Sequence, residues 1–441
     1  MTASPTEAPA RQRLGAMRTD PLLRNSALMF LTTVLMAGGG ALFWVVAARV
    51  QTPENVGLAG SLVSAADALA LFAQLGLNIT LLRTMPTSDR RAADVATAAC
   101  VVVTAGALFA FVYSALLPLT SPRLHDVLGS PITIGIFCVL VAMTALNVLT
   151  DSVFLSIDRV KSYLWLNGVL LGVAKCSLPF LIGGAGALGL YGSVGGAALL
   201  CGIASLVVIF THVPGSRRPR PSRQLWEARH FAGAGYATYV LNVIPQMVIP
   251  LLIINAVGPA DSAVFFISTQ IVTLQTAVVL AVGNSMYAEG ERAPHRRLEV
   301  LRRGGVTLGV VALGGASVVL VMAPYFLQIF GTHYAEEGTL TLRVLSLGVL
   351  AFAFNYWSAM RLRMARHLRA MMGVQLSCTV LILVAAFLVA PYGTVWIAFA
   401  WACGQLVGGI IGYVVSRTVA PVRDESVPPR DQVGPALSGP R

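Results

Sequence analysis

Two long apolar runs near the start of the chain limit what it can fold into. Residues 25–50 and 56–82 are predominantly apolar, and the short polar segment 51–55 joins them. An α-helix needs about 20 apolar residues to cross the ~30 Å hydrocarbon core of a bilayer, and both runs exceed that length. The pattern predicts two transmembrane helices joined by a tight turn.

The composition indicates that the rest of the chain also belongs in a membrane. The 441 residues are 56% hydrophobic and 11% charged, and a soluble protein with so few charges could not keep its surface hydrated. The formal net charge of +12 is divided among short basic clusters between apolar runs, which argues against nucleic-acid binding. The six cysteines show no paired spacing, so we expect no disulfide framework, metal site or cofactor.

The apolar runs predict an all-α polytopic membrane protein with about twelve transmembrane helices. Lys and Arg are retained on the cytoplasmic side of membranes. Of the 31 basic residues, 27 fall in the two tails and in alternate loops if both termini are cytoplasmic. We therefore expect both termini inside.

The loop 214–230 is rich in Pro and Arg and separates six predicted spans from six. The sequence thus predicts an N-terminal lobe at 25–213, a basic cytoplasmic linker at 214–230 and a C-terminal lobe at 231–417. The polar segments 1–24 and 418–441 are expected to be disordered cytoplasmic tails.

The first pair of spans recurs 206 positions later. With the turn at Pro53 laid on Pro259, Gly39 falls on Pro245 and Asn78 falls on Asn284. Such similarity predicts a duplicated architecture. In transporters, spans interrupted by Gly or Pro at matching places point to the substrate path, which makes Gly39, Pro245 and Pro250 candidate helix breaks. Close helix packing and simple kinks are the alternative explanations.

Two charges lie deep inside predicted spans of the first lobe. A charge at mid-depth in a bilayer costs roughly 2.5–3.5 kcal/mol on insertion scales, so such residues are candidates for function. Asp67 and Lys175 lie at similar depths, and we expect them to touch or to share a water. The pair is either a static lock between helices or a sensor of protonation or cation entry.

Amide and arginine side chains complete the predicted substrate path. Amides can bind sugar hydroxyls because each offers donors and acceptors, although amides also join helices. Arginine matches a pyrophosphate with two parallel hydrogen bonds, although topology and anionic lipids would also place arginines at helix ends. The path candidates are Arg24, Asp67, Gln74, Asn78, Arg83, Lys175, Asn242, Gln246 and Asn284.

Short motifs in both hairpins carry a family resemblance. The turn PENVG at 53–57, the segment LGLN at 75–78 and the basic exit with Arg83 and Pro86 resemble the first hairpin of polysaccharide exporters or O-antigen-type flippases. These proteins belong to the multidrug/oligosaccharidyl-lipid/polysaccharide exporter superfamily. Gly258-Pro259 and the segment AEGE at 288–291 are similar to the second-half hairpin of that family.

The resemblance implies a MATE-like bundle of two six-helix lobes in the plasma membrane. It also implies a flippase that moves a polyprenyl-pyrophosphate-linked oligosaccharide for cell-surface polysaccharide, including lipopolysaccharide, biosynthesis. The implied partners are the lipid-linked oligosaccharide, membrane lipids and polysaccharide-assembly enzymes.

Two other functions compete with the flippase. A cation-coupled multidrug antiporter of the same superfamily needs buried carboxylates, for which Asp67 is the clear candidate. A membrane glycosyltransferase or polymerase needs a sizeable outward loop and a metal-binding acidic motif or nucleophile, and the sequence shows neither. We therefore expect a transporter and not an enzyme.

The topology can be tested by cysteine labelling on a cysteine-free background. Cysteines at Ser222 and His367 should be shielded from an impermeant thiol reagent in intact cells, whereas cysteines at Asp261 and Glu336 should react. Labelling of Ser222→Cys in intact cells would contradict the predicted orientation, because the central linker would then lie outside.

Overall fold

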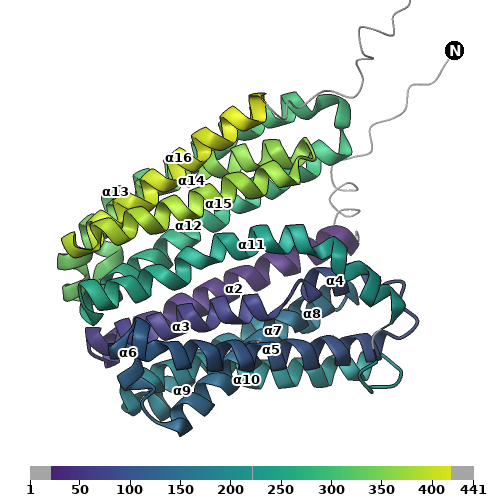
Figure 1. The fold of residues 1–441 in the computed structure, drawn as a ribbon, viewed down its shortest axis with the longest axis horizontal. Helices are drawn as coiled ribbons and strands as arrows, with labels where there is room; N and C mark the ends of the chain where they lie inside the picture. Colours follow the sequence, from purple (N-terminus) through teal and green to yellow (C-terminus); the bar gives the residue numbers. More distant parts are fainter. Residues whose placement is uncertain (1–20, 221, 419–441) are drawn as a thin grey trace, which may run out of the picture. The chain divides into compact units, whose positions relative to one another are not determined.

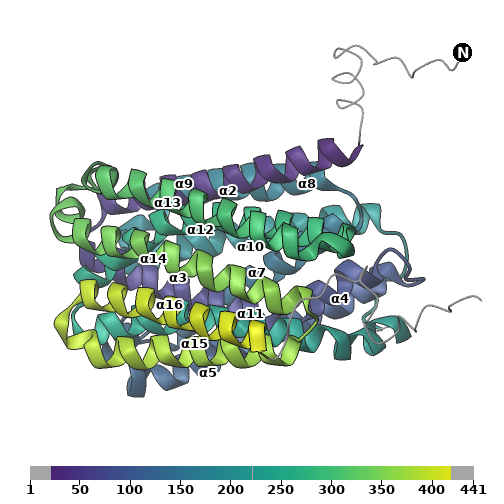
Figure 2. The same ribbon diagram turned by 90° about the horizontal axis from the view of Figure 1, so that it is seen from above.

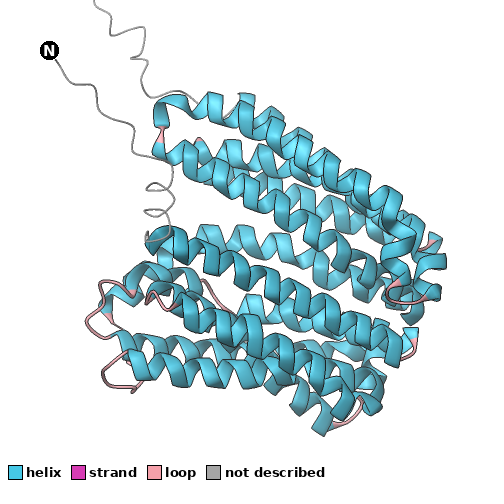
Figure 3. Cartoon of the chain, turned by 180° about the vertical axis from the view of Figure 1, so that it is seen from behind, coloured by secondary structure: helices cyan, strands magenta, loops and turns pink. Residues whose placement is uncertain are grey.

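The computed structural model describes residues 21–220 and 222–418, and its regular elements in those ranges are all helical (Figure 3). The predicted tails lie mostly outside the described residues. Long apolar sequences adopt helices in a membrane because a helix satisfies every backbone N–H and C=O within itself. The all-α prediction is confirmed.

The elements follow one another with short connections (Figure 1). In the first half they are α2 (Pro21–Val50), α3 (Pro53–Ala73), α4 (Leu77–Thr84), α5 (Arg91–Thr120), α6 (Pro122–Val127), α7 (Pro131–Ser156), α8 (Val160–Tyr163), η1 (Leu164–Leu170), α9 (Leu171–Ile182), η2 (Gly183–Ala185) and α10 (Gly186–His212). In the second half they are α11 (Arg223–Ala256), α12 (Pro259–Arg292), η3 (Pro294–Arg296), α13 (Arg297–Gln328), α14 (Thr332–Met364), α15 (Leu368–Val389), η4 (Ala390–Tyr392) and α16 (Thr394–Thr418).

Ten described helical segments are long and apolar enough to cross a membrane. One of them, Val160–His212, contains the separate helices α9 and α10, and α11 adds a shorter apolar stretch at Val243–Ala256. The prediction of about twelve spans is therefore consistent with the structure.

The chain divides into two compact units. Among the described residues, the first unit contains 21–51, 65–220 and 222–233, and the second contains 52–64 and 234–418. Helix α3 is shared, because its first turns belong to the second unit and the rest belongs to the first. The predicted N-terminal lobe at 25–213 contains all of α3, whereas the structure assigns the first turns of α3 to the second unit; the predicted C-terminal lobe is 231–417.

In the first unit, α7 packs against both α5 and α10 (Figure 1). Their contacts form an apolar core that includes Val102, Leu149 and Phe154. Helix α2 packs on α9 and η1. Gly39 lies where α2 meets α9, and a Cβ there would come within 3.1 Å of the Cα of Gly172. Gly39 therefore permits close helix packing.

In the second unit, α14 packs against α12, α13 and α16 (Figure 2). Its contact with α16 is close because α16 presents glycines to it. A Cβ on Gly409 would lie 3.0 Å from the backbone N of Asn355, and a Cβ on Gly412 would lie 3.1 Å from Ser358 Cβ. Small residues bring membrane helices into this kind of close contact.

The start of α3 packs closely on the start of α12 within the second unit. Ser61 Oγ lies 3.2 Å from Ser262 Oγ, and both side chains are buried. A Cβ at Gly57 would overlap the carbonyl oxygen of Pro259. The two turns that the 206-residue repeat aligns therefore begin helices that are in contact.

The helix breaks expected at Gly39, Pro245 and Pro250 are absent. Helix α2 continues through Gly39, and α11 continues through both prolines. A proline inside a helix leaves the carbonyl four residues earlier without a donor. For Pro245 that carbonyl belongs to Leu241, and the buried Thr379 hydroxyl donates to it at 2.9 Å. The replacement hydrogen bond allows the helix to continue.

The second span is interrupted instead at residues 74–76, between α3 and α4. Leu75 and Gly76 have φ angles of 48° and 78°. This left-handed conformation is unfavourable for a residue with a side chain and easy for glycine. The turn redirects the chain before Asn78 and Arg83.

Gly57→Ala should destabilise the protein because the new methyl group collides with the Pro259 carbonyl. Overpacking of this kind costs about 1–3 kcal/mol. Gly38→Ala is a matched control, since no atom lies within 4 Å of its added Cβ. Thermal unfolding in detergent should show a lower midpoint for Gly57→Ala alone, and equal midpoints would contradict the described contact.

Candidate functional site

The two charges predicted to lie inside the membrane belong to the first unit. Asp67 on α3 is exposed, and Lys175 on α9 is half-buried. Each interacts electrostatically with the other. Among the described residues, however, no Asp67–Lys175 ion pair lies within 4.0 Å. The first alternative, direct contact, is therefore excluded, and the two charges attract at longer range; the second alternative, a shared water, stays a prediction.

The predicted path residues around the α3–α4 break differ in their surroundings. Gln74 is buried, and its Nε2 donates to the carbonyl of Ala145 on α7 at 2.8 Å. Asn78 is half-buried, and its Oδ1 accepts from the backbone N–H of Ile79 at 2.9 Å. Arg83, in the last turn of α4, is exposed. Gln74 thus joins helices, whereas Arg83 lies at the surface of the first unit.

In the second unit, Gln246 and Asn284 are exposed. The Tyr356 hydroxyl donates to Asn284 Oδ1 at 3.0 Å. Pro245 and Pro250 are buried within α11. The side chains of Arg24 and Asn242 lie outside the described residues, so their predicted roles stay predictions.

A buried polar cluster joins three helices of the first unit. Asn147 on α7 donates from Nδ2 to Asn167 Oδ1 at 3.1 Å, and Cys201 Sγ on α10 lies 3.3 Å from the same oxygen. Asn167 lies in η1, a π-helical segment within the fifth span. Segments of this kind often occur at functional sites.

This cluster is not fully satisfied. Asn147 Oδ1 and Asn167 Nδ2 are buried and have no hydrogen-bond partner. A buried polar atom without a partner costs about 1–3 kcal/mol. Native proteins rarely keep such atoms, so two in one cluster require an explanation.

Asp151 adds a carboxylate to the same cluster. It lies on α7 four residues after Asn147, which places both side chains on one helix face. Its Oδ1 is buried without a hydrogen-bond partner. Asp151 lies near Tyr163 and Cys201. We call Asn147, Asp151, Tyr163, Asn167 and Cys201 the Asp151 cluster.

Lys175 interacts electrostatically with Asp67. Asp151 is a second carboxylate of the same unit, on α7.

The second unit contains a comparable amide cluster without the acid. Asn355 on α14 donates from Nδ2 to Gln405 Oε1 on α16 at 2.7 Å, and Cys378 Sγ on α15 lies 3.5 Å from the same nitrogen. Neither amide has a buried atom without a partner. These amides therefore have a structural role, which is to connect helices by hydrogen bonds.

Asp151 was missed because it lies near the end of its predicted span, at 132–153, where a charge can reach the interface. In the structure α7 continues to Ser156, so Asp151 is more than one turn from the helix end. The signal that could have found it is the Asn147–Asp151 spacing of four.

The Asp151 cluster can bind a proton or a small cation. Its unpaired atoms include one carboxylate oxygen and one amide oxygen, which are ligands that hard cations prefer. The described residues contain no group of three or more His, Cys, Asp or Glu side chains that could hold a metal ion.

Solved structures with the same fold are transporters. An inward-facing multidrug resistance MATE family transporter of the MOP superfamily matches with a TM-score of 0.66 and 15% identity, over 87% of this chain and 93% of that chain. An outward-facing MATE family transporter matches with a TM-score of 0.58 and 15% identity, over 94% and 98% of the two chains. A MOP superfamily transporter from Pyrococcus furiosus, described as having a binding pocket of reverse polarity, matches with a TM-score of 0.59 and 14% identity, over 91% of this chain and 96% of that chain.

No protein-family model matches the sequence, and no curated protein matches it either. At identities of 14–15% the likeness to solved structures shows the fold. The predicted MATE-like fold is confirmed.

Two substitutions should separate the structural amide cluster from the Asp151 cluster. Asn355→Leu should lower the thermal midpoint, because Gln405 Oε1 loses its donor at a cost of about 1–3 kcal/mol. Asp151→Asn should leave the midpoint unchanged or raise it, because a neutral amide is less costly than a carboxylate in an apolar unit. Equal losses of stability would make Asp151 a structural residue.

Proposed function

We propose that this protein is a cation-coupled membrane transporter and not an enzyme, and that its substrate is a polyprenyl-pyrophosphate-linked oligosaccharide. The observation that carries the coupling is the buried Oδ1 of Asp151, which has no hydrogen-bond partner and lies about one helical turn after Asn147 on α7. The fold supports transport, since its solved neighbours are described as MATE and MOP transporters.

Coupling follows from the charges of the first unit. When no proton or cation is bound, the buried Oδ1 of the Asp151 carboxylate lacks a hydrogen-bond donor and destabilises the surrounding helices. A bound proton or Na⁺ removes that cost. A conformation in which the cluster opens would release the cation, so the cation biases the unit between two states. Lys175 attracts Asp67, whereas Asp151 has no cationic side chain within 4.0 Å among the described residues.

The oligosaccharide substrate is supported by the motifs of the first hairpin and by its exposed arginine. Arg83 follows the left-handed turn at 75–76 and is exposed in the last turn of α4. A guanidinium can bind a pyrophosphate with two parallel hydrogen bonds. The exposed amides of Gln246 and Asn284 can bind sugar hydroxyls. On this proposal the protein works in the plasma membrane alongside polysaccharide-assembly enzymes.

A cation-coupled multidrug antiporter is the second candidate. Asp151 favours it, because a carboxylate that binds a cation in the first unit supplies what such an antiporter needs. Two of the matching structures are described as multidrug resistance transporters. The substrate, and not the coupling, separates the two candidates.

Reconstituted protein can decide between the substrates. Proteoliposomes should carry a fluorescent polyprenyl-pyrophosphate disaccharide to the opposite leaflet, measured by an impermeant quencher, and Arg83→Ala should slow this movement. Arg83→Lys should restore it only partly, because the ammonium lacks the fork of the guanidinium. Arg302→Ala is the matched control, since Arg302 is an exposed arginine on α13.

Efflux of a cationic dye such as ethidium, without movement of the lipid-linked sugar, would support the antiporter and contradict the flippase. In cells, deletion of the gene should cause the lipid-linked oligosaccharide to accumulate on the inner leaflet under the flippase proposal. Increased drug sensitivity without this accumulation would again favour the antiporter.

A further inference from the structure

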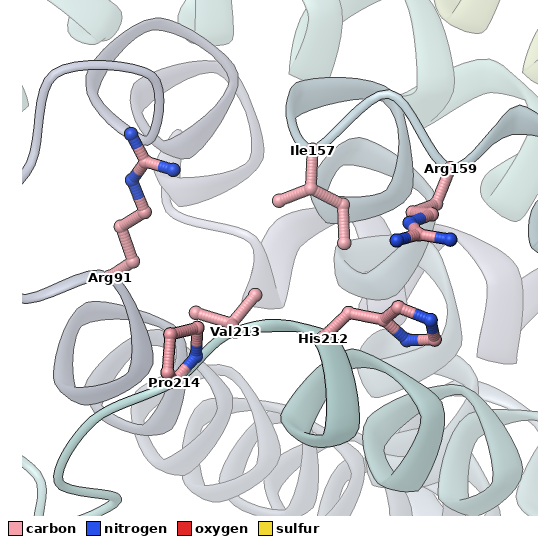
Figure 4. Close-up of a pocket in the computed structure, with 6 residues that line it drawn as sticks. All are labelled: Arg91, Ile157, Arg159, His212, Val213 and Pro214. Atoms are coloured by element: carbon pink, nitrogen blue, oxygen red, sulfur yellow. The ribbon is translucent and has the colours of Figure 1, made fainter.

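Two adjoining hollows lie at one end of the first unit, where three loops meet. The smaller, of about 150 Å³, is lined by Arg91, Ile157, Arg159, His212, Val213 and Pro214 (Figure 4). The larger, of about 350 Å³, shares Pro214 and is lined also by Asp89, Arg90, Ala92, Ala93, Gly215, Ser216, Arg218 and Arg220. The lining residues belong to the α4–α5 and α7–α8 connections, to the segment after α10, and to the adjoining ends of α5 and α10.

The loops around the hollows are held in place by a buried carboxylate. Asp94, in the first turn of α5, is fully buried. Its Oδ2 accepts a hydrogen bond from Ser88 Oγ at 2.6 Å, and its Oδ1 accepts from the backbone N–H of Ser222 at 2.8 Å. These bonds connect the loop before α5 to the loop after α10. The walls of the hollows therefore have a defined geometry.

The hollows are strongly basic. In Figure 4, Arg91 lies on one side of the smaller hollow, and Arg159 and His212 lie on the other. Arg91 donates to the Pro86 carbonyl at 2.7 Å, which is a neutral partner. In the described part of the chain, none of the five arginines that line the hollows has a carboxylate within 4.0 Å.

Acidic residues offset only part of this charge. Asp89 is the single acidic residue among the described lining residues, and the buried carboxylate of Asp94, hydrogen-bonded to Ser88 and Ser222, directly follows the lining residue Ala93, so the five arginines outnumber these two acids. Like charges gathered without acid partners repel one another, and the free energy is lowered by a bound anion. A phosphate suits this site because guanidinium groups bind its oxygens in pairs.

We propose that these hollows bind the phosphate of an anionic phospholipid headgroup. The lining residues lie directly at the ends of the membrane helices α5 and α10, which is the depth of lipid headgroups. The charge distribution predicts that these loops are cytoplasmic, and the inner leaflet carries the anionic lipids that attract basic segments. The site is separate from the Asp151 cluster and does not depend on the transported substrate.

The test is a titration of the full-length purified protein with phosphatidylglycerol, read by native mass spectrometry. Arg159→Gln combined with Arg218→Gln removes one arginine from each hollow. This pair should weaken the highest-affinity phosphatidylglycerol site by about tenfold, the loss expected when a hydrogen bond to a charged group is removed. Binding of phosphatidylcholine should be weak for wild type and should not change.

The matched control is Arg302→Gln combined with Arg303→Gln, which removes the same charge from exposed positions on α13 outside the hollows. This control should change the affinity by less than about twofold. Arg159→Lys with Arg218→Lys should bind more weakly than wild type, since only a built site requires the guanidinium fork.

Three results would overturn the proposal. The glutamine pair could bind phosphatidylglycerol like the control, or the lysine pair could bind like wild type, which would indicate diffuse attraction. Alternatively, inorganic pyrophosphate could displace the lipid at equal concentration, which would assign the hollows to a free phosphate. If the glutamine pair lowers the thermal midpoint in phosphatidylcholine, the lysine pair is compared with Arg302→Lys and Arg303→Lys instead.

Discussion

The absence of water in the hydrocarbon core is the constraint on which the rest of this structure depends, because every polar group there needs a partner within the protein. The prolines inside helices show how the chain supplies partners for polar groups in the hydrocarbon core. Pro245 frees the Leu241 carbonyl, and Thr379 donates to that oxygen. Pro324 frees the Leu320 carbonyl, and Arg343 Nε donates to it at 3.0 Å. The bond explains how a half-buried arginine is accommodated in α14.

The same constraint distinguishes the two amide clusters. In the second unit, Asn355 and Gln405 satisfy each other and connect α14 to α16. In the first unit, a similar arrangement leaves oxygens of Asn147 and Asp151 unpaired. An unsatisfied group is tolerated where function requires it, and a carboxylate that alternates between empty and occupied states cannot have a permanent donor. This difference is why the proposed coupling site lies in the first unit and not in the second.

The helical fold follows from apolar length alone, and the repeat correctly aligned the hairpin turns at Pro53 and Pro259. The helix break at Leu75–Gly76 could not be predicted, and neither could the division of α3 between the two units. Both depend on tertiary contacts, such as that of Gly57 with Pro259, which a local sequence pattern does not encode. Asp67 and Lys175 were found from depth, but their separation depends on helix rotation. Asp151 was missed because helix ends are poorly defined by hydropathy, and the buried pairing of Asn147 with Asn167 near it depends on tertiary packing.

Infrared difference spectroscopy on protein in lipid tests the central claim most directly, because it detects protonation of single carboxyl groups without a transported substrate. Wild-type protein should show a carboxyl band that changes with pH or on addition of Na⁺. Asp151→Asn should lack this change, and Asp67→Asn should retain it. A spectrum of Asp151→Asn that responds to pH and Na⁺ as wild type does would contradict the assignment of the coupling site to Asp151.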